Sequence, residues 1–185
     1  GGRSDNSADV SGYDNNIGTN GDGNIIGGGY LNDIGNSSDN ASILAGRDNN
    51  IGVDSDGGII GGGYNNDIGA SSHSSVIAGG YNNNIASTSL ATSSYVAMLG
   101  GLDNDVNTGS SYATVVGGYN NDIGSNVDHG FIGGGTSNVI ANSATQAVIV
   151  GGWDNEITGA AIQASILGGT SHRIGDADWS SIGGG

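Results

Sequence analysis

A glycine that is in most repeats the second of a pair returns along this chain at an almost constant interval. We call it the anchor glycine, and the anchors are Gly12, Gly29, Gly46, Gly63, Gly80, Gly101, Gly118, Gly135, Gly152 and Gly169. Ser11 and Ala45 replace the first glycine of the pair before Gly12 and Gly46. The difference between successive anchor numbers is 17 at every step but one, the step from Gly80 to Gly101, where an insertion of four makes it 21. A fixed period in this range is typical of a repeat architecture, in which each repeat is one structural unit.

Aliphatic residues occupy two positions in almost every repeat, three residues before the anchor and five after it. The isoleucines at these positions form a predicted apolar spine of Ile26, Ile43, Ile60, Ile77, Ile132, Ile149, Ile166, Ile34, Ile51, Ile68, Ile85 and Ile123. An even number of residues separates the two positions, so both fall on one face of an extended chain. Because isoleucine also favours strands, the pattern predicts β-structure.

An asparagine follows the anchor by three residues in nine of the ten repeats. These residues form a predicted structural ladder of Asn15, Asn32, Asn49, Asn66, Asn83, Asn104, Asn121, Asn138 and Asn155, and only the last repeat differs, with His172. If the repeats stack in register, each side-chain amide can bond to the next repeat. Each such bond contributes about 0.5–1.5 kcal/mol of net stability.

These columns predict an all-β fold, a parallel β-solenoid (β-roll) of about ten 17-residue coils with two short strands in each coil. A helix is excluded by the absence of a 3.6-residue apolar period, and each glycine in a helix would cost about 0.8–1 kcal/mol relative to alanine. The glycine pair marks the corner between the two strands, because glycine alone takes a positive φ without steric cost. Coils stacked about 4.8 Å apart would make a rod on the order of 50 Å long.

The sequence is consistent with one repeat domain over residues 1–185. It divides into a partial coil (1–11), regular coils (12–85), an insertion (86–95), further regular coils (96–175) and an unfinished coil (176–185). Neither end carries a recognisable capping element, and open strand edges invite pairing with another chain. We therefore expect either a segment of a longer fibre protein or a subunit that stacks end to end.

Composition excludes several classes of partner. The net charge is −15 with no lysine and three arginines, so a nucleic-acid partner, which needs a basic surface, is not expected. No apolar run is long enough for a membrane span. The chain has no cysteine, which rules out disulfides and thiolate metal sites.

The turn residues between the second strand of one coil and the first strand of the next vary most, and variable edges of rigid scaffolds often carry binding specificity. Asp22, Asp39 and Asp56 each lie ten residues after an anchor and should stack on this edge. Stacked carboxylates are candidate ligands for Ca²⁺, the one cofactor we consider, and the alternative is a solvated acidic edge. A glycan or a cell-surface ligand is the partner that such an edge suggests.

The sequence contains no clustered catalytic groups, and we assign no catalytic residue and expect no enzyme. Asp105 with Asp122, or Asp154 with Glu156, could be drawn as the carboxylate pair of a glycosidase, but surface charge is the favoured interpretation. The rings that follow most anchors could stack on sugars, although packing beside the spine or at a chain–chain interface is favoured: Tyr13, Tyr30, Tyr64, Tyr81, Tyr119 and Trp153.

The stretch Ile60-Gly61-Gly62-Gly63-Tyr64-Asn65-Asn66-Asp67-Ile68-Gly69, with its counterparts from Ile26 to Gly35 and from Val115 to Gly124, resembles repeats of bacterial surface and phage fibre proteins. The family it resembles is the YadA-like head of trimeric autotransporter adhesins. This resemblance implies a left-handed parallel β-roll, three chains side by side and an extracellular adhesive or spacer role. The present chain departs from the family in its longer period and its asparagine column.

The sequence thus favours a non-enzymatic structural protein, the shaft or head of an extracellular fibre or adhesin at a cell surface or on a phage virion. We expect a homo-oligomer, either a trimer or an end-to-end filament. The first alternative is a subunit of a self-assembling extracellular filament. The lesser alternative is a Ca²⁺-binding or polysaccharide-active module.

Overall fold

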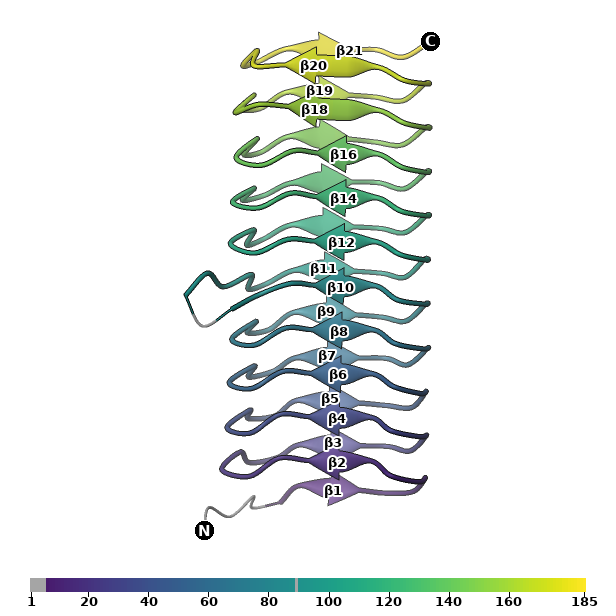
Figure 1. The fold of residues 1–185 in the computed structure, drawn as a ribbon, viewed down its shortest axis with the longest axis vertical. Helices are drawn as coiled ribbons and strands as arrows, with labels where there is room; N and C mark the ends of the chain where they lie inside the picture. Colours follow the sequence, from purple (N-terminus) through teal and green to yellow (C-terminus); the bar gives the residue numbers. More distant parts are fainter. Residues whose placement is uncertain (1–5, 89) are drawn as a thin grey trace.

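The computed structural model describes residues 6–88 and 90–185, which form a single stack of coils (Figure 1). One wall of the stack is an eleven-stranded sheet made of the odd-numbered strands. These are β1 (Ala8–Asp9), β3 (Ile25–Ile26), β5 (Ser42–Ile43), β7 (Ile59–Ile60), β9 (Val76–Ile77), β11 (Ala97–Met98), β13 (Thr114–Val115), β15 (Phe131–Ile132), β17 (Val148–Ile149), β19 (Ser165–Ile166) and β21 (Ser181–Ile182).

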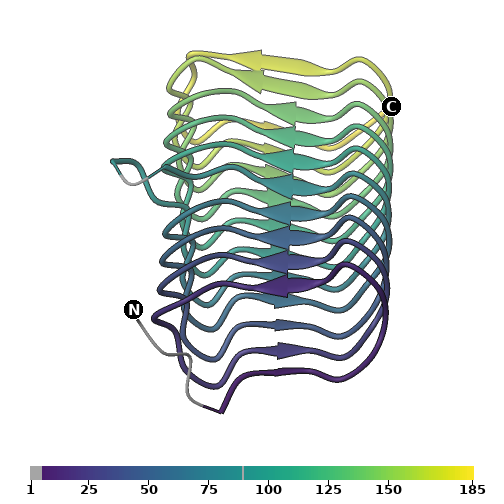
Figure 2. The same cartoon turned by 60° about the horizontal axis from the view of Figure 1, so that its bottom comes forward.

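The opposite wall is a ten-stranded sheet made of the even-numbered strands. These are β2 (Asn16–Ile17), β4 (Asp33–Ile34), β6 (Asn50–Ile51), β8 (Asp67–Ile68), β10 (Asn84–Ile85), β12 (Asp105–Val106), β14 (Asp122–Ile123), β16 (Val139–Ile140), β18 (Glu156–Thr158) and β20 (Arg173–Gly175). Figure 2 shows the two walls facing each other, with their arrows running in opposite directions.

Every strand pairs in parallel with the equivalent strand of the next coil. Ile43 pairs with Ile60, for example, which holds the same position one repeat further along the chain. The number of residues between paired positions is larger at the insertion, where Asn84 pairs with Asp105. It is one residue smaller than the repeat at the last coil, where Ser165 pairs with Ser181. This architecture confirms the predicted all-β parallel solenoid of about ten coils.

The core is one layer of aliphatic side chains between the two walls. All twelve isoleucines of the apolar spine are fully buried, and Met98, Val106 and Val115 occupy the same positions in their coils. Burying a side chain of this size contributes on the order of 1.5–3 kcal/mol. Because neither wall can bury its apolar face alone, stability comes from stacking many coils.

The corner of each coil depends on the anchor glycine. All ten anchors have positive φ, from +92° at Gly135 to +114° at Gly12. A Cβ built on Gly80 would lie 2.3 Å from the carbonyl oxygen of Gly101 and 2.5 Å from Nδ2 of Asn83. The anchor is therefore glycine for two reasons, its backbone conformation and the closeness of the next coil.

Non-glycine residues also adopt the left-handed conformation, at fixed places in each coil. The position two residues after the anchor has φ between +53° and +57° in all ten coils, at Asp14, Leu31, Asp48, Asn65, Asn82, Asp103, Asn120, Ser137, Asp154 and Ser171. Short polar side chains tolerate this conformation best, because they bond to the local backbone. This requirement explains why Asn, Asp and Ser dominate the corners.

The connection between β10 and β11 extends beyond the turns of the other coils (Figure 1). Thr88 and Ala91 form an antiparallel bridge within it, and the Leu90 side chain is 97% exposed. Of the partial coil expected over residues 1–11, residues 1–5 lie outside the described residues, and β1 lies in the rest. The described part of the chain contains no helix that could cross a membrane.

Candidate functional site

The asparagines of the structural ladder lie behind the corner, and those from Asn32 to Asn155 are fully buried. Asn66 shows the pattern, since its Nδ2 donates to the carbonyl oxygens of Gly62 at 3.0 Å and Gly80 at 3.1 Å. The same Nδ2 also donates to Oδ1 of Asn49 in the preceding coil at 3.1 Å. At the end of the ladder, His172 donates its backbone N–H to Oδ1 of Asn155 at 3.1 Å. The ladder thus holds neighbouring coils together and is not accessible to a ligand.

A second polar row runs along the outer surface of the ten-stranded sheet. It consists of the first residue of each strand, which is polar in all strands but β16, where it is Val139. Amides and carboxylates alternate over its first six members: Asn16, Asp33, Asn50, Asp67, Asn84 and Asp105. Nδ2 of Asn16 donates to Oδ1 of Asp33 at 2.5 Å, and Nδ2 of Asn50 donates to Oδ1 of Asp67 at 2.5 Å. The neutral amides separate the carboxylates and so limit the repulsion between coils about 4.8 Å apart.

A third row follows the left-handed corner residues. Nδ2 of Asn65 donates to Oδ1 of Asn82 at 2.5 Å, and Nδ2 of Asn82 donates to Oδ1 of Asp103 at 2.7 Å. Between this row and the second one lies an open groove of about 450 Å³, lined by Asp48, Asn50, Asn65, Asn66, Asp67, Asn82, Asn84 and Asp105. Apart from Asn66, whose side chain is buried in the ladder, the lining residues offer amides and carboxylates, so the groove can exchange hydrogen bonds with a polyhydroxylated ligand.

The alternation of the second row breaks at Asp105 and Asp122, which are direct partners of adjacent strands. Burial, and then the negative charge of Asp105, raise the pKa of Asp122 to about 6. Nδ2 of Asn107 donates to Oδ1 of Asp122 at 2.6 Å and opposes that shift. Burial also raises the pKa values of Asp67 and Asp105. The structure thus brings together one of the two carboxylate pairs considered in the sequence.

The second of those pairs has other partners. Asp154 accepts a hydrogen bond from Oγ of Ser171 at 3.0 Å. The Glu156 carboxylate lies 3.5 Å from the guanidinium of Arg173 in the next coil. Both carboxylates therefore interact with the following coil.

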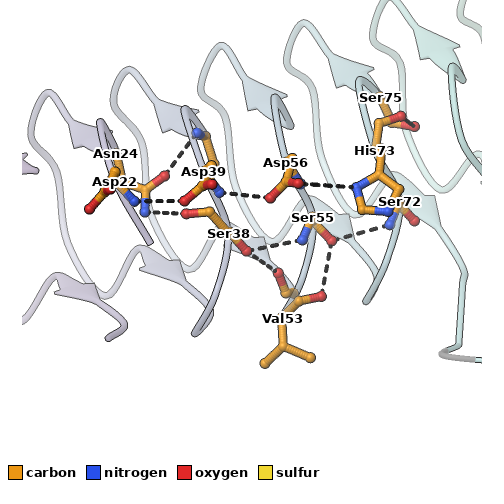
Figure 3. Close-up of polar contacts among 12 residues, drawn as sticks. Asp22, Asn24, Ser38, Asp39, Val53, Ser55, Asp56, Ser72, His73 and Ser75 are labelled. Carbon is orange, nitrogen blue, oxygen red and sulfur yellow. Dashed lines mark hydrogen bonds and ion pairs between the residues drawn. The ribbon is translucent and has the colours of Figure 1, made fainter. Parts of the chain in front are cut away.

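The aspartates of the turn edge stack along the rod as expected (Figure 3). Oδ1 of Asp39 accepts the backbone N–H of Asp22 at 2.8 Å, and Oδ1 of Asp56 accepts that of Asp39 at 2.8 Å. His73 continues the row, with Nδ1 3.3 Å from the backbone nitrogen of Asp56. Carboxylates at this edge thus cap backbone N–H groups of the preceding coil, a role that the sequence did not suggest.

In residues 6–88 and 90–185, no three His, Asp or Glu side chains are grouped so as to hold a metal ion. Binding of Ca²⁺ at Asp22, Asp39 and Asp56 stays a prediction.

Four of the rings that follow the anchors contact each other in pairs, of which the first is stacked and the second tilted. The rings of Tyr13 and Tyr30 lie 5.7 Å apart and those of Tyr64 and Tyr81 lie 5.1 Å apart. Arg47 lies between the two pairs, 5.4 Å from the Tyr30 ring and 5.3 Å from the Tyr64 ring. These contacts join neighbouring coils and so stabilise the stack. Further along the row, Tyr119 and Trp153 have Leu102, Thr136 and Thr170 as neighbours and are 47% and 54% exposed.

Another stack, on the turn edge beside the insertion, was missed in the sequence. The Tyr112 ring lies 5.1 Å from Tyr95 and 4.9 Å from His129, nearly parallel to both. The sequence did contain a signal for this stack, because the three residues are separated by the length of the repeat. The other two histidines lie in different coils. His172 ends the asparagine ladder, and His73 extends the aspartate row.

In comparisons with known proteins, no family model and no curated protein matches this chain. The resemblance to YadA-like head repeats therefore stays a prediction.

Proposed function

We propose that this chain is a structural rod, the shaft or head of an extracellular fibre or adhesin. The observation that carries the proposal is the repetition of one set of inter-coil bonds along the whole stack. Asn32, Asn66 and Asn138 each bridge three successive coils in the same way. Parallel strand pairing joins the same coils on both walls.

This arrangement resists bending. Bending the rod would lengthen the hydrogen bonds of one wall and compress those of the other, and each wall contains a continuous ladder. A lost buried hydrogen bond leaves a donor or acceptor unsatisfied, at a cost of about 1–3 kcal/mol. A scaffold of this kind keeps its surface rows at fixed spacing, which suits repeated weak contacts with an extended partner.

The surface that we propose for contact is the groove between the two polar rows, together with the variable turn edge. The groove combines amide donors with amide and carboxylate acceptors, the groups that recognise sugar hydroxyls. A net charge of −15 disfavours anionic partners, so the ligand that fits best is a neutral or cationic glycan.

Hydrogen–deuterium exchange tests the rod. If the chain is a uniform scaffold, the strands from β4 to β18 should share one high protection level and exchange only through global unfolding. Low protection confined to the strands around one site, as expected for a mobile catalytic region, would contradict the structural role.

Binding to immobilised bacterial polysaccharides tests the groove. Asn82→Ser should lower retention several-fold, because Asn82 lines the groove. The matched control is Asn120→Ser, which changes the same corner position in a coil outside the groove, where Ser137 and Ser171 show that serine is accepted. Equal binding by both variants would remove the groove from the proposal.

A polysaccharide-active module is a second candidate, favoured by the adjacent carboxyl groups of Asp105 and Asp122. A carboxyl group with a pKa of about 6 beside another carboxylate can act as a general acid toward a glycosidic oxygen. Release of reducing ends from the same polysaccharides by the wild type, and its loss in Asp122→Asn, would support this candidate. No release at pH 5–6 would exclude it for the polysaccharides tested.

A further inference from the structure

The groove between the two polar rows offers more hydrogen-bond acceptors than donors. Its amides donate along the rod, toward the next coil, as Nδ2 of Asn50 does to Asp67 and Nδ2 of Asn65 does to Asn82. Each of these amides therefore uses one of its two N–H groups within the wall of the groove, whereas each carboxylate adds two acceptor oxygens and no donor. A ligand that satisfies this surface must supply hydrogen-bond donors.

The carboxylates of the groove also lack a counter-charge. No Arg or His lines the groove in the part of the chain that the structure describes. Arg47 pairs with Asp48 at 3.1 Å, and no ion pair within residues 6–88 and 90–185 includes Asp67 or Asp105. Burial raises the pKa of both of these carboxyl groups, against the effect of the amides that donate to them. A partly buried carboxylate in this state is stabilised by a cationic partner.

The charge along the groove repeats every two coils. Asp67 in β8 and Asp105 in β12 are separated by Asn84 in β10 (Figure 1). Coils about 4.8 Å apart place the two carboxyl groups about 9.6 Å from each other. Asp33 in β4 continues this two-coil period outside the groove, and Asp122 ends it, because it follows Asp105 directly. Between β4 and β12 the wall thus has a polar group in every coil and a carboxylate in every second coil.

This spacing discriminates between extended cationic polymers. Side chains on one side of an extended peptide recur about every 6.6–6.8 Å, which does not match the distance of about 9.6 Å. In an extended chain of β-1,4-linked sugars, each residue covers a length close to one coil spacing, and successive residues are turned over. A substituent on one side of the sugar chain therefore recurs at every second residue, close to the distance between Asp67 and Asp105.

We propose that the groove binds an extended β-1,4-linked amino-sugar chain, with the ammonium groups of alternate residues at Asp67 and Asp105. An ammonium group brings three N–H donors and a positive charge, both of which the groove lacks. The amides of Asn50 and Asn84 then face hydroxyl groups of the same chain. The groove volume of about 450 Å³ falls in the range of about 300–1,000 Å³ that is usual for ligand sites. This assignment rests on the contact role proposed for the groove and specifies its glycan.

Isothermal titration calorimetry with defined oligosaccharides tests the role of charge. The probe is the β-1,4-linked tetramer of glucosamine at a pH at which its amines are protonated, and the comparison is the same tetramer with every amino group acetylated. The free amine should bind at least ten-fold more tightly at low salt, and added salt should reduce this difference. Equal affinity of the two tetramers overturns the proposal.

Two further tetramers of equal charge test the spacing. One carries its two free amino groups on the first and third sugars, and the other carries them on the first and second, with acetyl groups elsewhere. Only the former presents both ammonium groups to Asp67 and Asp105 from one side of the chain, so it should bind at least five-fold more tightly. Equal affinity of the two tetramers, or of putrescine, a flexible diamine of the same charge, overturns the fit to an amino-sugar chain.

Substitutions within the row locate the site. Asp67→Asn and Asp105→Asn each place an amide in a row that already contains Asn50 and Asn84, and each keeps an oxygen for the amide of the preceding coil, so the coils should keep their packing. Each variant should lower the affinity for the glucosamine tetramer at least three-fold. The double variant should bind the free and the acetylated tetramer equally, and a ten-fold preference that persists in it overturns the site.

The matched control is Asp154→Asn. It removes one negative charge at a corner position outside the groove, where Asn120 shows that an amide is accepted. The affinity for the glucosamine tetramer should stay unchanged. A loss equal to that of Asp67→Asn would assign the binding to overall charge and overturn the site.

Failure of the amino-sugar assignment and failure of the rod function give different results. Exchange protection reports on the rod, and the loss of polysaccharide retention in Asn82→Ser reports on the groove as a contact surface. If both of those results are obtained and the free amine shows no advantage, only the amino-sugar chain is rejected.

Discussion

Asn83 donates two hydrogen bonds to a single atom of Asn66, the side-chain oxygen Oδ1. Its backbone N–H and its Nδ2 both lie 3.1 Å from that oxygen. The Nδ2 of Asn66 in turn donates to Asn49 in the preceding coil and to Gly80 in the following one. One buried amide therefore satisfies backbone and side-chain groups in three successive coils, which isosteric leucine or aspartate could not do.

Replacing this amide should be among the most destabilising single changes in the chain. Asn66→Ala leaves the backbone N–H of Asn83 and the carbonyl oxygens of Gly62 and Gly80 without these bonds. We expect a loss of about 3 kcal/mol or more in the free energy of unfolding, measured by chemical denaturation. The control is Asn65→Ser at the adjacent exposed corner position, which should cost less than about 1 kcal/mol. Similar losses in both variants would refute the role assigned to the ladder.

Two adjacent glycines should respond very differently to alanine. At Gly80, φ is +102° and a Cβ would lie 2.3 Å from the carbonyl oxygen of Gly101, so Gly80→Ala should cost at least about 3 kcal/mol. At Gly79 the nearest atom to a Cβ is 3.7 Å away, and Ala45 stands at the equivalent place in another coil. Gly79→Ala should therefore change the midpoint of thermal unfolding little. The comparison fails if Gly79→Ala is as destabilising as Gly80→Ala.

The fold was predictable because its determinants recur in fixed columns. Ile60 and Ile77 fill the same place in successive coils, and so do Asn66 and Asn83. A parallel solenoid brings equivalent residues together, so a column in the sequence becomes a row in space.

Other features of the candidate site could not be predicted from the sequence, because they depend on backbone geometry that residue type does not reveal. Leu31 and Tyr95 take the left-handed conformation against their own preference, because the neighbouring coils impose it. Asn107 lies outside the amide row, yet it reaches Asp122. The capping of backbone N–H groups by Asp39 required the alignment of two coils in three dimensions.

The coil before the insertion contains a hydroxyl without a partner, and this gives a third prediction. Oγ of Ser55 donates to the carbonyl oxygen of Gly69 at 2.9 Å, and accepts the backbone N–H of Ser72 at 3.2 Å. Oγ of Ser72 is buried and has no hydrogen-bond partner among the described residues. Ser72→Ala should be neutral or stabilising, whereas Ser55→Ala should cost about 1–3 kcal/mol. A larger loss for Ser72→Ala in urea unfolding would show that its hydroxyl is satisfied.

The last prediction concerns pH and the break in the amide–carboxylate row. Because the pKa of Asp122 is raised to about 6 in the folded state, the folded chain holds a proton there that the unfolded chain releases near its ordinary pKa of 3.8. Ionisation of Asp122 therefore disfavours folding. Its contribution to stability is lost as pH rises through the window from about 4 to about 6. Asp122→Asn removes the charge and restores alternation, with its amide able to donate to Asp105 and its carbonyl oxygen able to accept from Asn107.

We expect Asp122→Asn to be more stable than the wild type by about 1–2 kcal/mol at pH 7, a value reduced for solvent screening. The difference should shrink as pH falls through this window and vanish well below the unfolded-state pKa of 3.8, where the wild-type carboxyl group is protonated in both states. Denaturation midpoints from about pH 3 to about pH 7 measure both quantities. The control is Asp128→Asn, which makes the same change in net charge at the exposed turn edge and keeps an oxygen for the backbone N–H of Ser111. If Asp122→Asn and Asp128→Asn gain equal stability over the wild type as pH rises, the overall charge of −15 causes the gain. A gain confined to Asp122→Asn would show that the stacked carboxyl groups of Asp105 and Asp122 cause it.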